Sequence, residues 1–183
     1  MVVHHDPAVR GDHKGRWSKP AIAELTANDL KQFPLAAGIS IPTLSEVLDA
    51  VTDKATIYVE IKARNIEPLV VRCIRESTAT CSVHSFDHRT IRTVKRLFPA
   101  IRTGVLETIR HPDPIAPLEE TGAEDLWQET GTIDEDLVAR VHSHNARVVA
   151  WTSNDPRQWK TFRAFGVDAI CTDRIGELAA FSW

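Results

Sequence analysis

From Thr56 onward, the sequence alternates short runs rich in β-branched residues with segments whose apolar residues recur every three or four positions. This alternation predicts a parallel sheet with helices outside it, because parallel strands need a long crossover that a helix can supply. Six such units fit a doubly wound α/β sheet or an incomplete barrel, and periodicity does not choose between them. The predicted strands are 56–63, 80–87, 101–106, 123–129, 147–154 and 168–173, and the predicted helices are 66–76, 88–98, 134–144, 156–165 and 175–181.

Two T-x-x-E pairs mark expected helix starts. Thr43 with Glu46 predicts a helix that precedes the first strand, and Thr132 with Glu135 predicts the start of the helix near 134–144. In such a capping box the threonine side chain and the acidic side chain each bond a backbone N–H group that would otherwise lack a partner.

The helix 156–165 carries its own signals: Asp155 as its cap, Pro156 at its first position and Gly166 just past its end. Farther upstream, residues 20–33 predict one helix. Because no linker composition interrupts the chain, we interpret residues 1–183 as a single domain.

The composition and charge give no reason to expect a nucleic-acid-binding or a membrane-spanning protein. The chain has 183 residues, of which 43% are hydrophobic and 26% charged, and its net charge is −3. That charge gives no electrostatic reason to expect nucleic acid as a partner. No apolar run approaches the length of a membrane-spanning helix, and no signal peptide is evident, so we expect a cytoplasmic protein unless a preceding segment carries such a signal. The three cysteines lack metal-like spacing and are expected to be buried thiols.

Polar side chains gather at the predicted carboxyl ends of the strands, where parallel α/β folds place their functional groups. Glu60 and Lys62 lie near the carboxyl end of the first predicted strand, and period-two alternation puts both on one face. They are either a structural ion pair, or an oxygen ligand for a hard divalent cation beside a lysine that binds an anionic group such as phosphate. The other residues of this kind are Ser85, Asp87, Glu107, Gln128 or Glu129, Trp151, Asn154 and Asp173.

Histidines offer a second set of candidates. His5, followed by Asp6 and Pro7, is either a solvated side chain near the start of the sequence or a functional imidazole. For the histidines that fall in predicted loops and helices, including His88, we expect surface roles.

Six blocks of the chain together resemble the glycerophosphodiester phosphodiesterase family. VVHHDPAVRG is similar to that family's VVxHDPxLxR segment, IPTLSEVL to iPtLeEvL, and VEIKA to lEiK. HSFDHRTI resembles qSFdxxxl, VVAWTSND resembles vxxWTvNd, and GVDAICTD resembles GvDgiiTD. The blocks occur in the family's order over nearly the whole chain.

The resemblance implies a (β/α)₈ TIM barrel and so selects the barrel over the doubly wound sheet. Family members begin with a strand that ends in H-R-G and a second strand that carries E-x-D. Neither motif has a counterpart in this sequence, which therefore predicts six of the eight barrel strands. If the resulting sheet edge is uncovered, we expect a homo-oligomer.

The resemblance also implies hydrolysis of a small glycerophosphodiester to glycerol 3-phosphate and an alcohol, with a divalent metal, Ca²⁺ or Mg²⁺, and two histidines as general acid and base. By position, His5 is one of these histidines, Glu60 a metal ligand and Lys62 a ligand of the substrate phosphate. Phe86 and Trp151 contact the glycerol or the alcohol.

The departures from the family pattern bear on activity. The partner histidine and the E-x-D carboxylates have no counterpart, so we expect the chain by itself to be impaired or inactive. The alternatives are a non-catalytic relic or phosphate-binding module on the same fold, and another metal-dependent phosphodiesterase on this barrel, such as the related phospholipase D-like toxins.

Overall fold

The computed structural model describes residues 1–13, 16–36, 38–52 and 54–181. The chain divides into two compact units. The first comprises residues 1–55 and 72–79, and the second comprises residues 56–71 and the chain from Thr80 onward.

The first unit packs around a small apolar centre. Val9, Leu30, Phe33 and Ile41 are buried together there. The capping box predicted at Thr43 is confirmed: the Thr43 hydroxyl accepts from the backbone N–H of the third helical residue, whose carboxylate accepts from the Thr43 N–H at 2.7 Å. The elements of this unit are β1 (Gly11–His13), β2 (Arg16–Ser18), which pairs with β1 antiparallel, η1 (Ile22–Glu24), α1 (Ala27–Leu30) and α2 (Leu44–Val51).

The prediction of one helix over residues 20–33 is wrong. The short helices η1 and α1 lie there instead, and Leu25 between them is extended. Thr26 and Asp29 form a capping box of their own, in which the Asp29 carboxylate accepts from the Thr26 N–H at 3.1 Å. The cap starts a new helix and so prevents η1 from continuing into it.

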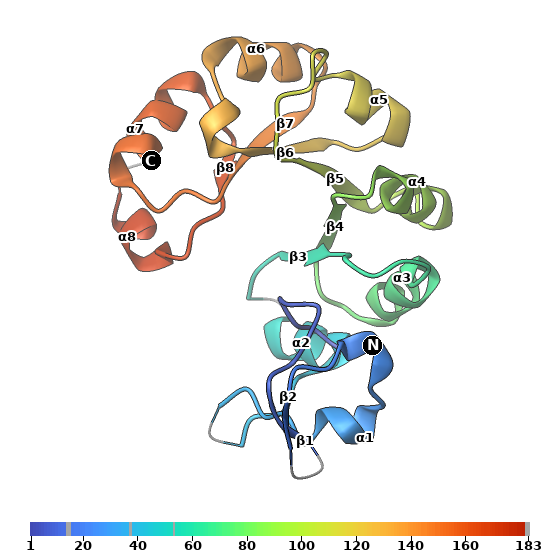
Figure 1. The fold of residues 1–183 in the computed structure, drawn as a ribbon. Coiled ribbons are helices and arrows are strands. Elements are labelled where there is room, and N and C mark those ends of the chain that lie inside the picture. The colour runs from blue at the N-terminus through green and yellow to red at the C-terminus, as the bar shows by residue number, and fades with distance from the viewer. Residues whose placement is uncertain (14–15, 37, 53, 182–183) are drawn as a thin grey trace. The chain divides into compact units, whose positions relative to one another are not determined.

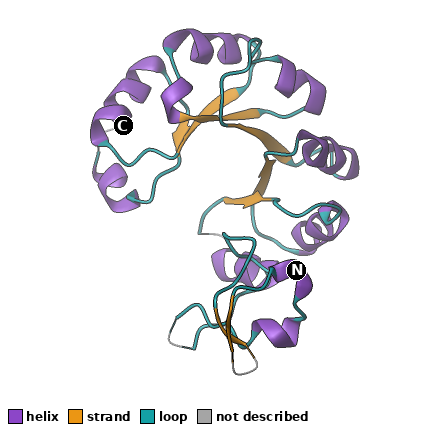
Figure 2. Ribbon diagram, in the orientation of Figure 1, coloured by secondary structure: helices purple, strands orange, loops and turns teal. Residues whose placement is uncertain are grey.

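The second unit is a curved sheet of six parallel strands, each bonded to the next in chain order. Figure 1 shows α4 to α7 on the outer side of this curve, and Figure 2 shows the strands following one another along its inner side. The strands are β3 (Ile57–Glu60), β4 (Cys81–Ser85), β5 (Arg102–Glu107), β6 (Asp125–Glu129), β7 (Arg147–Trp151) and β8 (Ala169–Ile170). The helices are α4 (His88–Leu97), α5 (Ala116–Thr121), η2 (Thr130–Thr132), α6 (Glu135–Ser143), α7 (Pro156–Phe165) and α8 (Ile175–Ala180), together with the first half of α3 (Glu67–Glu76), whose residues from Arg72 onward belong to the first unit. This arrangement confirms the incomplete barrel.

Of the helix signals predicted in this unit, those of α7 are confirmed and the capping box at Thr132 is not. For α7 they are confirmed, because Asp155 caps it, Pro156 begins it and Gly166 ends it with a φ of 83°. The capping box at Thr132 is wrong: Asp134 caps α6 by accepting from the backbone N–H of Leu137 at 2.8 Å.

Two further elements differ from the prediction. The last strand forms a ladder only at Ala169 and Ile170 rather than over 168–173. Helix α5 was not predicted; its N-cap, Ile115, makes no side-chain capping bond, so the sequence holds no polar start signal for it.

Alternation along the strands separates two apolar layers. Val83, Val105 and Val148 are fully buried on one face, which the register of the ladder places on the helix side. Leu106 and Trp127, which stand opposite each other in neighbouring strands, pack with Val149 on the inner face.

A buried ion cluster joins the amino-terminal ends of three strands. Asp125 is fully buried and accepts from Arg102 at 2.6 Å and from Arg147 at 2.9 Å, each through two nitrogens of its guanidinium. The hydrogen bond with Asp125 raises the pKa of Arg147 above its ordinary value. The cluster thus fixes β5, β6 and β7 at the edge of the sheet opposite to their carboxyl ends.

We expect Asp125→Asn to destabilise the chain by about 3 kcal/mol, because it leaves two guanidinium groups partly buried without a counter-charge. The free energy of unfolding in urea, followed by far-UV circular dichroism, measures the change. Glu120→Gln is the control, since it removes a carboxylate whose pair with Arg92 is exposed and is worth at most about 1 kcal/mol. Equal destabilisation by the two substitutions would contradict a structural role for the cluster.

Candidate functional site

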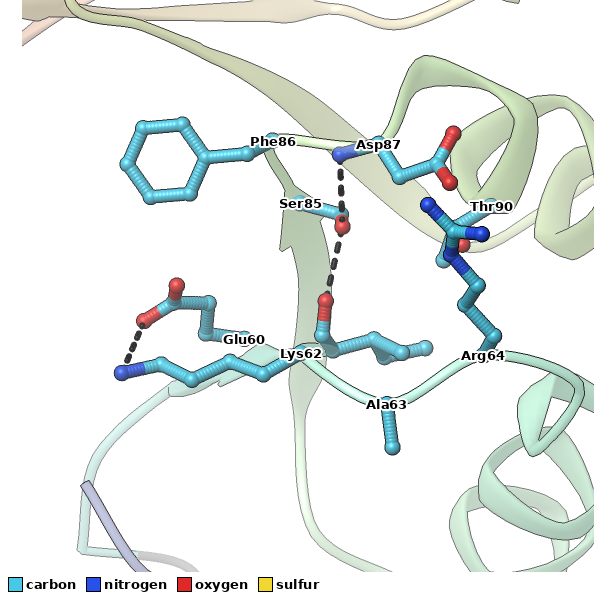
Figure 3. A pocket seen from close by; sticks show the side chains of 9 residues that line it. Glu60, Lys62, Ala63, Arg64, Ser85, Phe86, Asp87 and Thr90 are labelled. Atoms are coloured by element: carbon cyan, nitrogen blue, oxygen red, sulfur yellow. Dashed lines mark hydrogen bonds and ion pairs between the residues drawn. The ribbon is translucent and has the colours of Figure 1, made fainter. Parts of the chain in front are cut away.

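A pocket opens at the carboxyl ends of β3 and β4, between the loops that follow these strands. Its volume is about 360 Å³. Figure 3 shows Glu60 and Lys62 at one end of the pocket and Arg64 at the other, with Phe86 and Asp87 on the wall opposite Lys62 and Arg64. The pocket therefore lies where the sequence predicted that polar groups would gather.

Glu60 and Lys62 are brought together as predicted. The Lys62 Nζ and a Glu60 carboxylate oxygen are 3.5 Å apart, and the two side chains are 41% and 27% exposed. This face of β3 is not fully buried, since Tyr58 on the same face is also 39% exposed. The physical reason is that β3 ends the strand order and has one neighbour in the sheet. Partial exposure leaves the lysine accessible to a ligand.

Phe86 and Trp151 are also brought together. Their ring centroids are 5.4 Å apart and their planes meet at 81°, an edge-to-face contact. The Trp151 indole is held in place because its N–H donates to the backbone carbonyl of Trp127 at 3.0 Å. Phe86 is 48% exposed, so the pair presents an apolar surface beside Lys62 rather than a closed core contact.

One hydroxyl connects the two loops of the pocket. Ser85 is buried, donates to the carbonyl of Ile61 at 2.7 Å and accepts from the N–H of Asp87 at 3.1 Å. Asp87 in turn caps α4 and receives two side-chain hydrogen bonds from Arg89. These bonds, with the nearby charge of Arg64, hold the pKa of Asp87 at about 2, so its carboxylate is ionised.

An aromatic stack lies next to this site on the inner face. His84 stacks on Trp127 with centroids 4.3 Å apart, and the edge of Tyr58 meets the indole at 5.3 Å. Gly104 makes this possible, because a Cβ atom there would lie 2.7 Å from the Trp127 ring. Among the described residues, neither His84 Nδ1 nor Trp127 Nε1 has a hydrogen-bond partner, although both atoms are buried.

Burial lowers the pKa of His84 to about 4; the Asp125 carboxylate opposes this shift and the Lys62 ammonium adds to it. The imidazole is therefore neutral near pH 7. The sequence interpretation missed His84, yet the period of two from Ser82 through His84 to Phe86 was a signal that could have placed it on the inner face.

His5 belongs to the first unit, unlike the residues that line the pocket. Its side chain is 90% exposed, and its Nδ1 lies 3.0 Å from a carboxylate oxygen of Asp6. This contact lowers the pKa of Asp6. The adjacent His4 donates to the Asp6 carbonyl at 2.8 Å.

The remaining strand-end polar residues form pairs instead of a single ring. His88, for which a surface role was favoured, lies 3.3 Å from Glu107, and both are mostly buried. Asn154 donates to Asp173 at 2.8 Å and so connects the ends of β7 and β8. Gln128 is buried and donates to Thr132 at 2.6 Å.

The described residues do not by themselves fit a metal ion. Hard cations such as Ca²⁺ bind six to eight oxygen ligands. Within the ranges that the structure describes, no three His, Cys, Asp or Glu side chains are grouped so that they could hold an ion. Glu60, the expected ligand, is paired with a lysine.

Two broader expectations can be compared with the described residues. Every helix among them is too short or too polar to traverse a lipid bilayer. The cysteines Cys73, Cys81 and Cys171 are half-buried, whereas the sequence predicted buried thiols.

The curved sheet, with its pocket at the carboxyl edge of the strands, defines an α/β-barrel protein. Known structures agree. A phosphodiesterase of Oleispira antarctica in complex with the product sn-glycerol-3-phosphate is similar with a TM-score of 0.87 and 19% identity, over 98% of this chain and 78% of that one. A glycerophosphodiester phosphodiesterase of Thermotoga maritima is similar with a TM-score of 0.80 and 22% identity, over 98% and 78%.

Sequence comparison establishes the family. The profile of the Glycerophosphoryl diester phosphodiesterase family matches residues 1–177. A glycerophosphodiester phosphodiesterase of Caldanaerobacter subterraneus subsp. tengcongensis is 26% identical over 94% of this chain and 76% of its own length. A relative of the same name from Bacillus altitudinis is also 26% identical, with the same coverage. The chain belongs to the glycerophosphoryl diester phosphodiesterase family, whose members are phosphoric diester hydrolases.

We expect Gly104→Ala to destabilise the chain by roughly 1–3 kcal/mol, because the added methyl group displaces the Trp127 indole from His84. Thermal unfolding measures the loss, and a changed near-UV circular dichroism spectrum reports the displaced indole. Gly176→Ala is the matched control: nothing lies within 4 Å of a Cβ atom there, and alanine favours the helix α8. If both variants melt alike, the close packing described for Gly104 is wrong.

The buried imidazole predicts a dependence of stability on pH. The pKa of His84 falls from 6.5 to about 4 on folding, so the unfolded chain takes up a proton first as the pH decreases. The contribution of His84 is fully present above pH 6.5 and is lost between about pH 6.5 and pH 4, by roughly 3 kcal/mol in total. His84→Gln should lose less stability than the wild type over this range, as measured by urea unfolding at each pH. Parallel curves for the two proteins would contradict the shifted pKa.

Proposed function

We propose that the chain binds a glycerophosphodiester at the β3–β4 pocket and catalyses its hydrolysis to glycerol 3-phosphate and an alcohol. The observation that carries the proposal is the pairing of Glu60, at the end of β3, with Lys62 in the loop that follows, inside a pocket that also presents Phe86. The family membership and the sn-glycerol-3-phosphate bound by the Oleispira relative support this substrate class.

In the proposed complex, Lys62 donates to an oxygen of the substrate phosphate, and the charge of the ammonium opposes the charge of the diester. Glu60 holds the lysine in position through the ion pair. The edge-to-face pair of Phe86 and Trp151 contacts the carbon skeleton of the glycerol or the alcohol. His5 is assigned as a general acid or base, the role that the family resemblance implies for it.

A divalent metal, Ca²⁺ or Mg²⁺, is part of the proposal because the family resemblance implies one. Glu60 would be one of its ligands, and further oxygen ligands would be needed beyond those that the described residues group together. For the same reason we expect hydrolysis by the 183 residues themselves to be impaired and therefore slow. Two expectations from the sequence remain predictions. One is that residues 1–183 act as a single domain, and the other is that they form a homo-oligomer if the sheet edge is uncovered.

Binding of sn-glycerol 3-phosphate tests the site independently of turnover. We expect Lys62→Met to weaken binding by roughly 10- to 100-fold, because it removes a charged hydrogen bond to phosphate. Isothermal titration calorimetry measures the dissociation constant. Lys160→Met, which removes an exposed lysine of α7, is the control and should leave it unchanged. Binding that does not depend on Lys62 would exclude this pocket as the phosphate site.

Hydrolysis is measured by the release of glycerol 3-phosphate from a glycerophosphodiester, with Ca²⁺, with Mg²⁺ and with a chelator. Release that requires a metal and is lost in Glu60→Gln supports the enzyme. Lys62-dependent binding with no release under any of these conditions favours the alternative, a phosphate-binding module on the same fold.

A further inference from the structure

The pocket has a second cation that the proposed reaction does not use. Arg64 lines the same pocket as Lys62, two residues farther along the loop that follows β3. In Figure 3 the two side chains diverge, Lys62 toward Glu60 and Arg64 toward Asp87 and Thr90. The pocket thus has a positively charged group at each end.

Among the residues that the structure describes, the charge of Arg64 is not neutralised by a bonded carboxylate, whereas the charge of the neighbouring Arg89 is. Arg89, in the first turn of α4, makes a two-nitrogen contact with Asp87. Within the described part of the chain, the Arg64 guanidinium makes no hydrogen bond or ion pair at bonding distance, and it affects Asp87 only through its charge. Arg64 is exposed, so all of its N–H donors can bind a ligand.

The other groups at this end of the pocket are already satisfied. The Asp87 carboxylate is bonded to Arg89 and to the backbone at the start of α4. The Thr90 hydroxyl donates to the buried carboxylate of Glu67 at 3.0 Å. At this end of the pocket, Arg64 is therefore the group whose N–H donors are available to a ligand. A guanidinium binds phosphate and carboxylate groups through two parallel hydrogen bonds.

We propose that Arg64 forms a subsite for the alcohol part of the diester and selects alcohols that carry an anionic group, either a phosphate or a carboxylate. This inference rests on the proposed function, in which the diester phosphate lies at Lys62. The alcohol then extends along the pocket to Arg64, which acts as a specificity-determining residue without contacting the bond that is cleaved.

Two matched pairs of ligands test the subsite by calorimetry, without turnover. Glycerophosphoinositol 4-phosphate and glycerophosphoinositol differ by one phosphate, and glycerophosphoserine and glycerophosphoethanolamine differ by one carboxylate. We expect the wild type to bind the member with the extra anion roughly tenfold more tightly in at least one pair. The pair that shows the preference identifies the anion as phosphate or carboxylate.

We expect Arg64→Gln to abolish the preference while changing the affinity for the other member of the pair less than about twofold. Arg64→Lys should keep part of it, because an ammonium preserves the charge and lacks the two-nitrogen geometry. Arg96→Gln is the control, since it removes an exposed arginine of α4 and the same unit of charge. Thermal unfolding verifies that each variant is folded.

The two proposals fail in different ways. Equal binding of both members of each pair by the wild type, or an equal loss for both members in Arg64→Gln, would overturn the Arg64 subsite and leave the proposed function standing. Absence of binding of every diester to the wild type would overturn the proposed function and the subsite with it.

Discussion

The parallel ladder from β3 to β8 is the constraint on which the site depends. Each strand is bonded to the next in register, so the carboxyl ends of all six meet at one edge. The buried cluster around Asp125 holds the opposite edge of three of these strands. The stabilising cluster and the proposed ligand site thereby lie at opposite ends of the same strands, so that a change at one end need not alter the other.

Signals that act within a few residues were sufficient to predict much of the fold. Alternation along 56–63 placed Glu60 and Lys62 on one face before any contact was known, because the pleat of a strand alone determines this. The cap at Asp155 and the glycine at 166 are equally local. The family blocks then selected the barrel, which periodicity could not do.

The features of the fold and the site that were not predicted depended on competition between two possible helix caps, or on contacts between segments that are distant in the sequence. Thr132 and Asp134 both offered a helix cap, and the aspartate accepts the capping bond. The stack of His84 on Trp127 requires a missing side chain at Gly104, three positions that lie in three different strands. Arg64 differs from Arg89 only in what surrounds it, so no sequence pattern separates the paired guanidinium from the available one.

The hydroxyl of Ser85 has a consequence for how this pocket can diversify. It bonds the backbone after β3 and the backbone after β4 at once, so the base of the pocket has a set width. Parting the two loops to admit a bulkier alcohol would leave a buried carbonyl and a buried hydroxyl without partners, which is costly. A variant of this chain that keeps Ser85 can therefore accommodate a bulkier ligand only through changes in the side chains at the rim of the pocket, because the spacing between the two loops stays the same.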